Sequence, residues 1–220
     1  VEELNNNGLI HRDIKPLNIL LTGKCIEKFG DVKLGDLGLQ SRVNKRKSVV
    51  SRWYRPLEVE LKYNYSSNID IFSIGCIMIE LVTQRPVLQS KGDREEHIKE
   101  IIKFFGNLPT ELITFFEKNV CNKDLLNFMK EYNDKYILKN RFLKTLNKLK
   151  ISKELKDIIK QCMELQPCKR PTATQLLKNP YFDEFEYTQD NIKNPITLTP
   201  NNKKTIKECM MIEDVVKNYS

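Results

Sequence analysis

Eight residues near the start of the chain, His11 to Asn18, carry side chains that suit phosphoryl transfer. This reaction needs a carboxylate that accepts the proton of the attacking hydroxyl, cations that neutralise the transferring group, and a ligand for a metal ion. Asp13, Lys15 and Asn18 could supply one of these each. Because the whole pattern rarely arises by chance, this stretch, called the reactive loop below, is the strongest candidate for a site.

A second acidic position follows at Asp36, and a hairpin should bring it close to Asn18. Apolar runs on either side of residues 23–31 predict two short strands joined by a turn. If Leu20 pairs with Leu34, Asn18 falls opposite Asp36 on the same face of the hairpin. The two oxygen ligands would suit Mg²⁺, which completes its shell with water and substrate phosphate. A shift of one residue in the pairing would separate them.

The composition describes one globular domain of ordinary size. The chain has 220 residues, of which 40% are hydrophobic, and its mean hydropathy is -0.48. The longest apolar run, residues 69–82, contains two acidic residues and is too short to span a bilayer. We therefore expect no membrane partner.

Charge and cysteine usage bear on partners and compartment. The formal net charge of +8 is spread along the sequence, with no stripe of cations and aromatic residues. A general bias in composition explains this charge better than a nucleic-acid surface does, so no nucleic-acid partner is expected. The six cysteines show no metal-ligand spacing, and several fall in apolar helical patterns. Reduced core thiols in a cytoplasmic or nuclear protein are the expectation.

A basic loop runs from Gln40 to Ser48. Such a charge run is commonly a solvated loop. The alternative is a regulated segment, in which a phosphate on Ser48 or Ser51 is surrounded by cations and orders the loop. Arg12 of the reactive loop would be the natural partner of that phosphate.

The stretch from Ser51 to Val59 contains the only tryptophan of the chain, Trp53. Aromatic residues next to Arg, Pro and Glu are typical of a packed wall rather than a free loop. Glu58 should then be buried or half-buried, and it would need a cationic partner. Arg170, in a distant segment with two prolines, is the candidate.

Residues 67–83 form the most apolar helix candidate. Apolar side chains occur all round it, which predicts a buried central helix capped by Ser67 or Asn68. Asp70 would then lie in a dry place and must be hydrogen-bonded, and we expect main-chain N–H groups of the reactive loop as donors. Gly75 should let another backbone approach closely.

Further helices are predicted along the rest of the chain. Apolar periodicity and terminal caps mark helices at 93–105, from 152 onward and at 172–177. Residues 107–150 should hold short helices whose positions the pattern does not define. The polar residues 183–220 are expected to form a loosely ordered tail.

These patterns resemble the C-terminal lobe of a eukaryotic protein kinase. The reactive loop is similar to the catalytic loop of that family, and Asp36-Leu37-Gly38 stands at the DFG position. Pro56-Leu57-Glu58 stands at the APE position, and residues 70–75 resemble the start of the central helix. Arg170 matches the arginine that pairs with the APE glutamate.

Two features resemble the CMGC group, which contains the cyclin-dependent and MAP kinases. Lys15 follows the serine/threonine pattern, and the segment from Ser51 to Arg55 is similar to the T-R-W-Y-R of that group. The stretch 107–150 sits where the group carries an insert. The resemblance implies phosphorylation of Ser or Thr before Pro, with Arg55 helping to shape the proline pocket.

The fold that the resemblance implies is mainly α, a helical bundle with a small β-hairpin that carries the catalytic and metal-binding loops. Residues 1–182 would be a partial kinase domain with an insert at about 107–150, followed by the tail. ATP and Mg²⁺ would be the cofactors. A protein substrate would be the main partner, with an activating subunit or an upstream kinase as further candidates.

The resemblance also implies a role for each matching residue. The catalytic residues would be Asp13 and Lys15. ATP would contact Lys15, Asn18, Leu20 and Asp36, and Mg²⁺ would be held by Asn18 and Asp36. The structural or regulatory positions would be His11, Arg12, Ser48, Arg55, Glu58, Asp70 and Arg170.

The sequence departs from the family pattern mainly in its missing N-lobe. It contains no Gly-rich loop, no Val-Ala-x-Lys strand and no helix with the paired glutamate, so we expect a fragment that is inactive on its own. Leu37 replaces Phe, and Pro56-Leu57 replaces Ala-Pro. Arg46 occupies the phosphothreonine position of MAP kinases, which leaves Ser48 as the candidate phosphosite.

Three functions stay open. The favoured one is a serine/threonine kinase whose N-lobe lies upstream in the full gene. The alternative is a catalytically inactive scaffold with a kinase fold, which the missing lobe favours and the intact Asp13 and Asp36 disfavour. A small-molecule phosphotransferase shares the Asp…Asn…Asp arrangement, but Arg55, Glu58 and Arg170 favour a groove for protein substrates.

Overall fold

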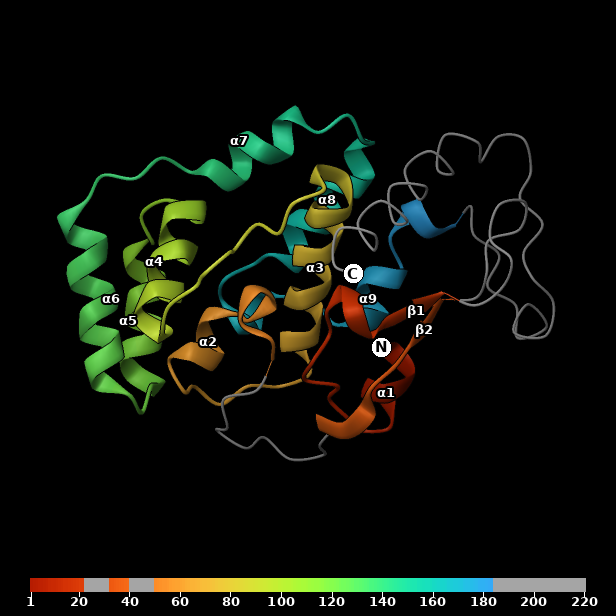
Figure 1. Ribbon diagram of the computed structural model, residues 1–220, viewed down its shortest axis with the longest axis horizontal. Helices are drawn as coiled ribbons and strands as arrows, with labels where there is room; N and C mark the ends of the chain where they lie inside the picture. The colour runs from red at the N-terminus through yellow and green to blue at the C-terminus, as the bar shows by residue number, and fades with distance from the viewer. Residues whose placement is uncertain (22–31, 40–49, 184–220) are drawn as a thin grey trace.

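The structure is a computed structural model, and it describes residues 1–21, 32–39 and 50–183. These residues are mainly helical, with one two-stranded antiparallel sheet (Figure 1), so the predicted fold class is confirmed. The α-helices are α1 (Glu2–Asn6), α2 (Leu57–Glu60), α3 (Asn68–Thr83), α4 (Arg94–Phe105), α5 (Thr110–Asn119), α6 (Lys123–Lys135), α7 (Arg141–Lys148), α8 (Lys153–Cys162) and α9 (Ala173–Leu177). The strands are β1 (Ile19–Leu21) and β2 (Val32–Leu34). Short 3-10 turns lie at Pro16–Asn18, Leu37–Leu39, Arg52–Tyr54, Pro167–Lys169 and Pro180–Phe182.

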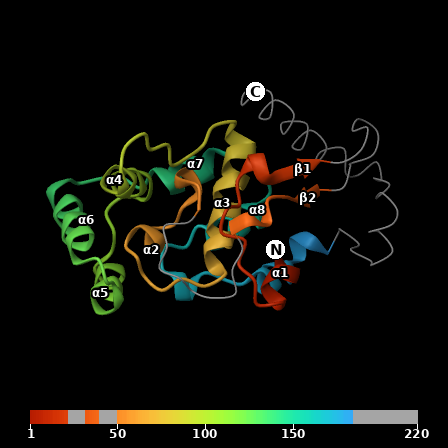
Figure 2. The same cartoon turned by 60° about the horizontal axis from the view of Figure 1, so that its bottom comes forward.

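α3 is the buried central helix that its apolar residues predict (Figures 1 and 2). α8 packs against it, and a Cβ added at Gly75 would lie 2.8 Å from the Cβ of Cys162. The lack of a side chain at Gly75 therefore lets α8 approach α3 closely, as predicted, and the nearest atoms belong to the side chains of Cys162 and Met163. Ser67 occupies the N-cap position of α3, as predicted, but its side chain makes no capping hydrogen bond, and the side chain of Asn68 donates to the carbonyl of Pro167 at 3.0 Å.

Most of the other predicted helix ends are confirmed. Asp93 caps α4 by accepting from the main-chain N–H of Glu96 at 3.1 Å, and the helix stops at Gly106, whose φ is 81°. Ser152 caps α8. Thr172 forms a capping box at the start of α9.

The stretch 107–150 contains the short helices that the sequence left unplaced. At one end of the molecule α6 packs against α4 and α5 packs against α6, while α7 also packs against α4 and leads towards α8 (Figures 1 and 2). Phe142 and Leu146 of α7 and Met129 of α6 are buried against this part of the core. Residues 107–150 therefore extend the same hydrophobic core.

The hairpin pairs in a different register from the predicted one. Ile19 pairs with Leu34, and Leu20 pairs with Lys33. This register turns Ile19 and Leu34 together towards the core, against which both are partly buried. The predicted pairing of Leu20 with Leu34 is thus wrong by one residue.

Several predictions fall on residues that the structure does not describe. These are the turn over 23–31, the basic loop with Ser48, and the tail from residue 184 onward. Within the described ranges, no helix combines the length and hydropathy needed to cross a membrane. The domain limits at 182 and 107–150 stay predictions.

Candidate active site

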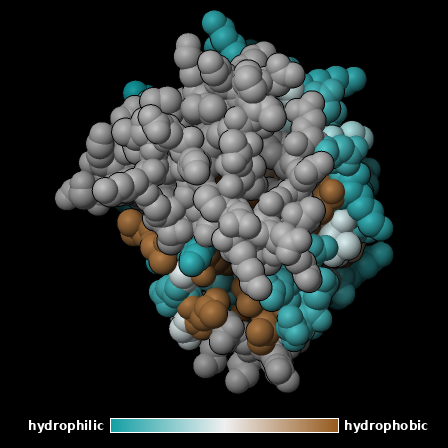
Figure 3. Space-filling model, turned by 90° about the vertical axis from the view of Figure 1, so that its right-hand side faces the viewer, coloured by the Kyte–Doolittle hydropathy of each residue, from teal (hydrophilic) through white to brown (hydrophobic). Residues whose placement is uncertain are grey.

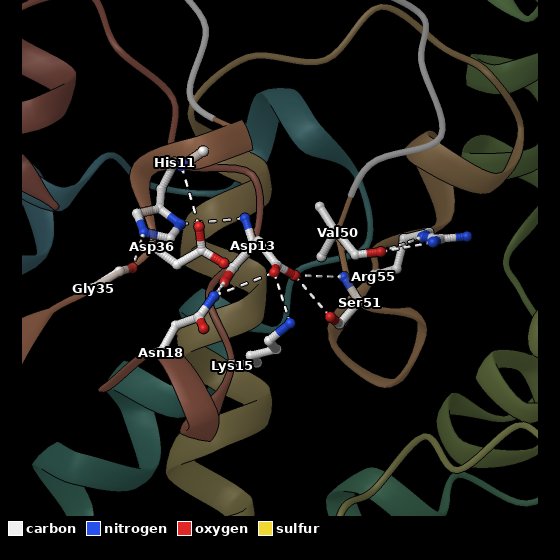
Figure 4. Close-up of polar contacts among 10 residues, drawn as sticks. His11, Asp13, Lys15, Asn18, Gly35, Asp36, Val50, Ser51 and Arg55 are labelled. Carbon is white, nitrogen blue, oxygen red and sulfur yellow. Dashed lines mark hydrogen bonds and ion pairs between the residues drawn. The ribbon is translucent and has the colours of Figure 1, made fainter. Parts of the chain in front are cut away.

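Asp13 lies at the centre of the candidate site and is 5% exposed (Figure 4). One carboxylate oxygen accepts from Nζ of Lys15 at 2.7 Å and from the Asn18 amide at 3.2 Å. The other accepts from the hydroxyl of Ser51 at 2.7 Å and from its main-chain N–H at 3.1 Å. Four donors therefore fill about four lone-pair positions that a carboxylate offers.

These donors keep the carboxyl group of Asp13 ionised. Burial acts to raise the pKa of Asp13, but hydrogen bonds from Lys15 and Ser51 and the charge of Lys15 outweigh it, so the pKa lies below its usual value. An ionised carboxylate near pH 7 is what proton acceptance from a hydroxyl requires.

Asp70 anchors the reactive loop to α3, as the sequence predicts. Its carboxylate oxygens accept from the main-chain N–H of His11 at 2.8 Å and of Arg12 at 2.9 Å. Asp70 is fully buried, and burial raises its pKa while the two N–H groups oppose the shift. The loop turns sharply here, because Arg12 has a φ of 68°.

His11 joins the reactive loop to the end of β2. Its Nε2 lies 3.0 Å from the carbonyl oxygen of Gly35, and its Nδ1 accepts from the main-chain N–H of Asp13 at 3.3 Å. The imidazole is fully buried, so it acts as a spacer of fixed geometry between Asp13 and the residue before Asp36.

Asn18 and Asp36 lie at the open end of the hairpin, but they do not face each other as a cross-strand pair. The main-chain N–H of Gly35 donates to the carbonyl of Asn18 at 2.7 Å, so Gly35 takes the predicted place of Asp36. Asp36 leaves the strand with a φ of 56° and is exposed. Figure 4 shows it beside His11 and Gly35, on the side of Asp13 away from Ser51.

The donor set fits Mg²⁺. The amide nitrogen of Asn18 donates to the carbonyl of Asp13 at 2.7 Å, which leaves the amide oxygen as the atom for a ligand. Asp36 accepts one N–H, from Gly38 at 3.2 Å, and keeps further acceptor capacity. Among the described residues, no group of three or more His, Cys, Asp and Glu could hold a metal ion. An amide oxygen with one carboxylate suits Mg²⁺, which keeps several water and phosphate ligands.

Leu20, the predicted ATP contact on β1, is 51% exposed. Other exposed apolar side chains on or near the hairpin are Leu17, Val32 and Leu37. Figure 3 looks at this end of the molecule and shows hydrophobic side chains on the described part of its surface.

Arg55 fixes the segment that follows the basic loop. Its Nε and Nη2 donate to the carbonyl of Val50 at 3.0 and 2.6 Å, and Nη1 donates to Glu60 at 2.9 Å. Val50 has a φ of 70°, which is unusual for a β-branched residue. Next to it lies a cavity of about 340 Å³, lined by Lys15, Pro16, Leu17, Ser51, Arg52, Trp53 and Tyr54.

A larger cavity of about 450 Å³ lies among α5, α7 and the end of α8. None of the predicted catalytic, ATP or metal residues within the described ranges lines it. Of those predicted residues, Lys15 lines the smaller cavity, together with Ser51.

Glu58 and Arg170 form the buried ion pair that the sequence predicts. Nη1 and Nη2 of Arg170 donate to the two carboxylate oxygens at 2.7 and 3.3 Å, and both side chains are fully buried. The guanidinium also lies over the ring of Phe72, 5.0 Å from its centroid. The pair ties the segment after Arg55 to the far end of the chain.

Sequence reasoning missed Glu60, His97 and the actual role of Ser51. The signal for Glu60 was an acid inside the apolar run 57–61. Ser51 was considered as a phosphosite, but a phosphate there would face the carboxylate of Asp13, which disfavours that alternative. Ser48 lies outside the described residues, so the proposed contact between its phosphate and Arg12 stays a prediction.

Comparison with known proteins gives consistent matches. A family model described as "Protein kinase domain" matches residues 1–182. Mouse mitogen-activated protein kinase 12 is 31% identical over 189 residues, covering 84% of this chain and 48% of its own length. Mouse serine/threonine-protein kinase ICK is 35% identical over 184 residues, covering 81% of this chain and 27% of its own.

Two further matches are another curated protein kinase and a solved kinase structure. A probable cyclin-dependent serine/threonine-protein kinase of Dictyostelium discoideum is 30% identical over 222 residues, covering 99% of this chain and 31% of its own. The crystal structure of the yeast RNA Pol II CTD kinase CTDK-1 complex superposes with a TM-score of 0.71 at 25% identity, covering 90% of this chain and 61% of that chain. The chain thus spans about half, or less, of the length of the curated relatives it matches.

Proposed function

Since this chain belongs to the protein kinase family and its relatives are CMGC-type serine/threonine kinases, we propose that the full-length protein transfers the γ-phosphate of ATP to a Ser or Thr hydroxyl of a protein. The observation that carries the proposal is Asp13, a buried carboxylate with a lowered pKa that accepts hydrogen bonds from Lys15 and Ser51, two residues that line a cavity. Use of ATP and Mg²⁺ follows from the family as a whole.

Asp13 would accept the proton of the substrate hydroxyl. All of its acceptor positions are filled by protein donors, so one donor must leave when the hydroxyl arrives. Lys15 is the donor with the most freedom, because its side chain is 24% exposed whereas Asn18 is buried. We infer that Nζ of Lys15 moves from Asp13 to the transferring phosphoryl group, where its charge is needed.

Asn18 and Asp36 would hold Mg²⁺, which when bound neutralises charge on the phosphates. The amide nitrogen of Asn18 stays on the carbonyl of Asp13, so the same side chain sets the distance between the metal ligand and the base. Leu20 would contact ATP through its exposed apolar side chain.

Selectivity for proline after the acceptor is supported by the carbonyl of Val50. This oxygen receives two hydrogen bonds from Arg55, so it cannot accept from a substrate main-chain N–H. A residue with an N–H would leave that group unpaired, at a cost of about 1–3 kcal/mol. Proline has no N–H and avoids the cost.

An activating subunit or an upstream kinase is proposed as a further partner. The solved yeast relative is described as a complex, which supports a subunit for this group.

The experiment for the function uses the full-length protein, γ-labelled ATP and peptides with Ser, Thr or Tyr as acceptor, each followed by Pro or Ala. We expect transfer to Ser and Thr, with Pro preferred. Transfer only to Tyr or only to small-molecule alcohols, or no transfer by protein purified with its partners, would contradict it.

A further inference from the structure

A buried acid, Glu60, pairs with Arg55 and lies outside the residues that carry the proposed reaction. Glu60 is fully buried at the end of α2, among Leu57, Val59 and Leu61. A carboxylate in such surroundings is unfavourable unless cations and hydrogen bonds compensate it. The contacts of Glu60 therefore indicate its role.

Two arginines surround Glu60. Oε1 accepts from Nη1 of Arg55 at 2.9 Å, and Oε2 lies 3.5 Å from Nη1 of Arg94, on the first turn of α4. The same nitrogen of Arg94 donates to the main-chain carbonyl of Glu60 at 2.9 Å. Burial raises the pKa of Glu60, and the charges of Arg55 and Arg94 oppose this shift. Arg94 thus helps to keep Glu60 in the form that pairs with Arg55.

Glu60 holds the guanidinium of Arg55, which in turn binds Val50, a residue with a positive φ. With Nη1 held by Glu60, Arg55 directs Nε and Nη2 at the carbonyl of Val50. A valine with a φ of 70° is strained, and these two hydrogen bonds hold it in that conformation. α4 also contacts the main chain of Arg55, because Nε2 of His97 lies 3.0 Å from the carbonyl oxygen of Arg55.

The peptide group between Val50 and Ser51 is held from both sides. Arg55 binds the carbonyl of Val50, and the N–H of Ser51 donates to Asp13 at 3.1 Å (Figure 4). A continuous series of contacts therefore joins Arg94 on α4 to the proposed catalytic base. If Arg55 turned away, this peptide group could rotate and its carbonyl could accept a substrate N–H.

We propose that Glu60 and Arg94 are positioning residues that hold Arg55 against the carbonyl of Val50 and thereby make the groove selective for a residue without an N–H after the acceptor. This inference rests on the proposed function. It differs from it in assigning selectivity to an acid and a cation that contact no substrate.

The test measures kcat/KM of the full-length protein for two peptides that differ only in Pro or Ala after the acceptor serine. Glu60→Gln keeps the shape and one acceptor but removes the charge. We expect the Pro/Ala ratio to fall about tenfold, mainly because the Ala peptide improves, since losing one charge-assisted hydrogen bond is worth about that factor. A purely structural defect would lower both peptides together.

Arg94 gives a matched series. Arg94→Met should lower the ratio in the same direction, and Arg94→Lys should restore most of it because the charge returns. Arg85→Met is the control, since Arg85 is an exposed arginine just after α3. If Glu60→Gln does not fold, the comparison of Arg94→Met with Arg94→Lys tests the inference instead.

The two proposals fail differently. A wild-type protein without preference for Pro overturns both the proposed selectivity and this inference. A wild-type protein that prefers Pro, with an unchanged ratio in Glu60→Gln and Arg94→Met, overturns this inference alone. A lower ratio in both variants, restored by lysine at position 94, supports it.

Discussion

Ser51 donates both its hydroxyl, at 2.7 Å, and its main-chain N–H, at 3.1 Å, to the same carboxylate oxygen of Asp13. The proposed base is thus bound to the segment that lines the substrate cavity, 38 residues along the chain. Any shift of that segment changes the surroundings of Asp13. The shape of the substrate cavity and the ability of Asp13 to accept a proton therefore depend on the same contacts.

Ser51→Ala should lower kcat/KM about tenfold at neutral pH, because one of the donors to Asp13 is lost. The hydrogen bond from Ser51 lowers the pKa of Asp13, so its loss raises that pKa and moves the acid limb of the pH–rate profile to higher pH. Steady-state kinetics from about pH 3 upward measures both, because the usual pKa of an aspartate is about 3.9. Ser51→Thr keeps the hydroxyl and is the control. An acid limb that stays in place would show that this hydroxyl does not act on Asp13.

Arg170→Met should destabilise the fold by about 3–5 kcal/mol, since it leaves the fully buried carboxylate of Glu58 without its cation. Urea unfolding followed by circular dichroism gives the free energy. The neighbouring Lys169→Met is the matched control, because Lys169 is exposed and should change little. Equal stability of the two variants would mean that the pair adds nothing to the fold.

The contacts that sequence reasoning found share one cause. Glu58 and Asp70 are charged residues in apolar surroundings, and each demands a specific partner, which limits the choice to Arg170 and to the N–H groups of the reactive loop. A buried charge needs a partner however far away that partner lies in the sequence. The need can therefore be recognised from one amino-acid sequence alone.

The hairpin register could not be predicted with the same security. Each strand has three residues, so the alternation of apolar side chains is too short to fix the pairing. The start of β1 is set instead by the turn Pro16–Asn18 and by the hydrogen bond from Asn18 to Asp13. Asp36 then leaves the strand through a left-handed residue, which a count of residues does not show.

Glu60 and His97 were missed because their partners come from separate elements. Each contacts Arg55, which the sequence assigned to a proline pocket and not to an ion pair. Only the packing of α4 against α2 brings Arg94 and His97 to this place.

The stability of the protein should decrease as the pH is lowered, because His97 is buried in its neutral form. Burial lowers the pKa of His97 from 6.5 to about 4, so the unfolded state binds a proton at pH values where the folded state does not. Stability is therefore full above about pH 6.5 and decreases by about 3 kcal/mol as the pH falls towards 4. Urea unfolding at several pH values measures the slope.

His97→Gln is the matched variant for that slope, because glutamine can still donate to the carbonyl of Arg55 but does not titrate. The difference in unfolding free energy between wild type and variant should grow as the pH rises from about 4 to 6.5. A difference that does not change with pH would contradict the assignment to His97.

A peptide with N-methylalanine after the acceptor serine separates the missing N–H from the proline ring. The carbonyl of Val50 is taken by Arg55, so the cost should come from the substrate N–H and not from its side chain. We expect kcat/KM for this peptide to approach that of the proline peptide and to exceed that of the alanine peptide about tenfold. Equal values for N-methylalanine and alanine would instead point to packing of the proline ring.

The measurement that tests the account most directly is the single-turnover rate of phosphate transfer to a Ser-Pro peptide by Asp13→Asn in the full-length protein. The amide cannot accept the proton, so the rate should fall by about 100- to 10,000-fold while ATP binding and thermal stability stay near those of the wild type. A variant that folds, binds ATP and transfers phosphate at the wild-type rate would show that Asp13 is not the base.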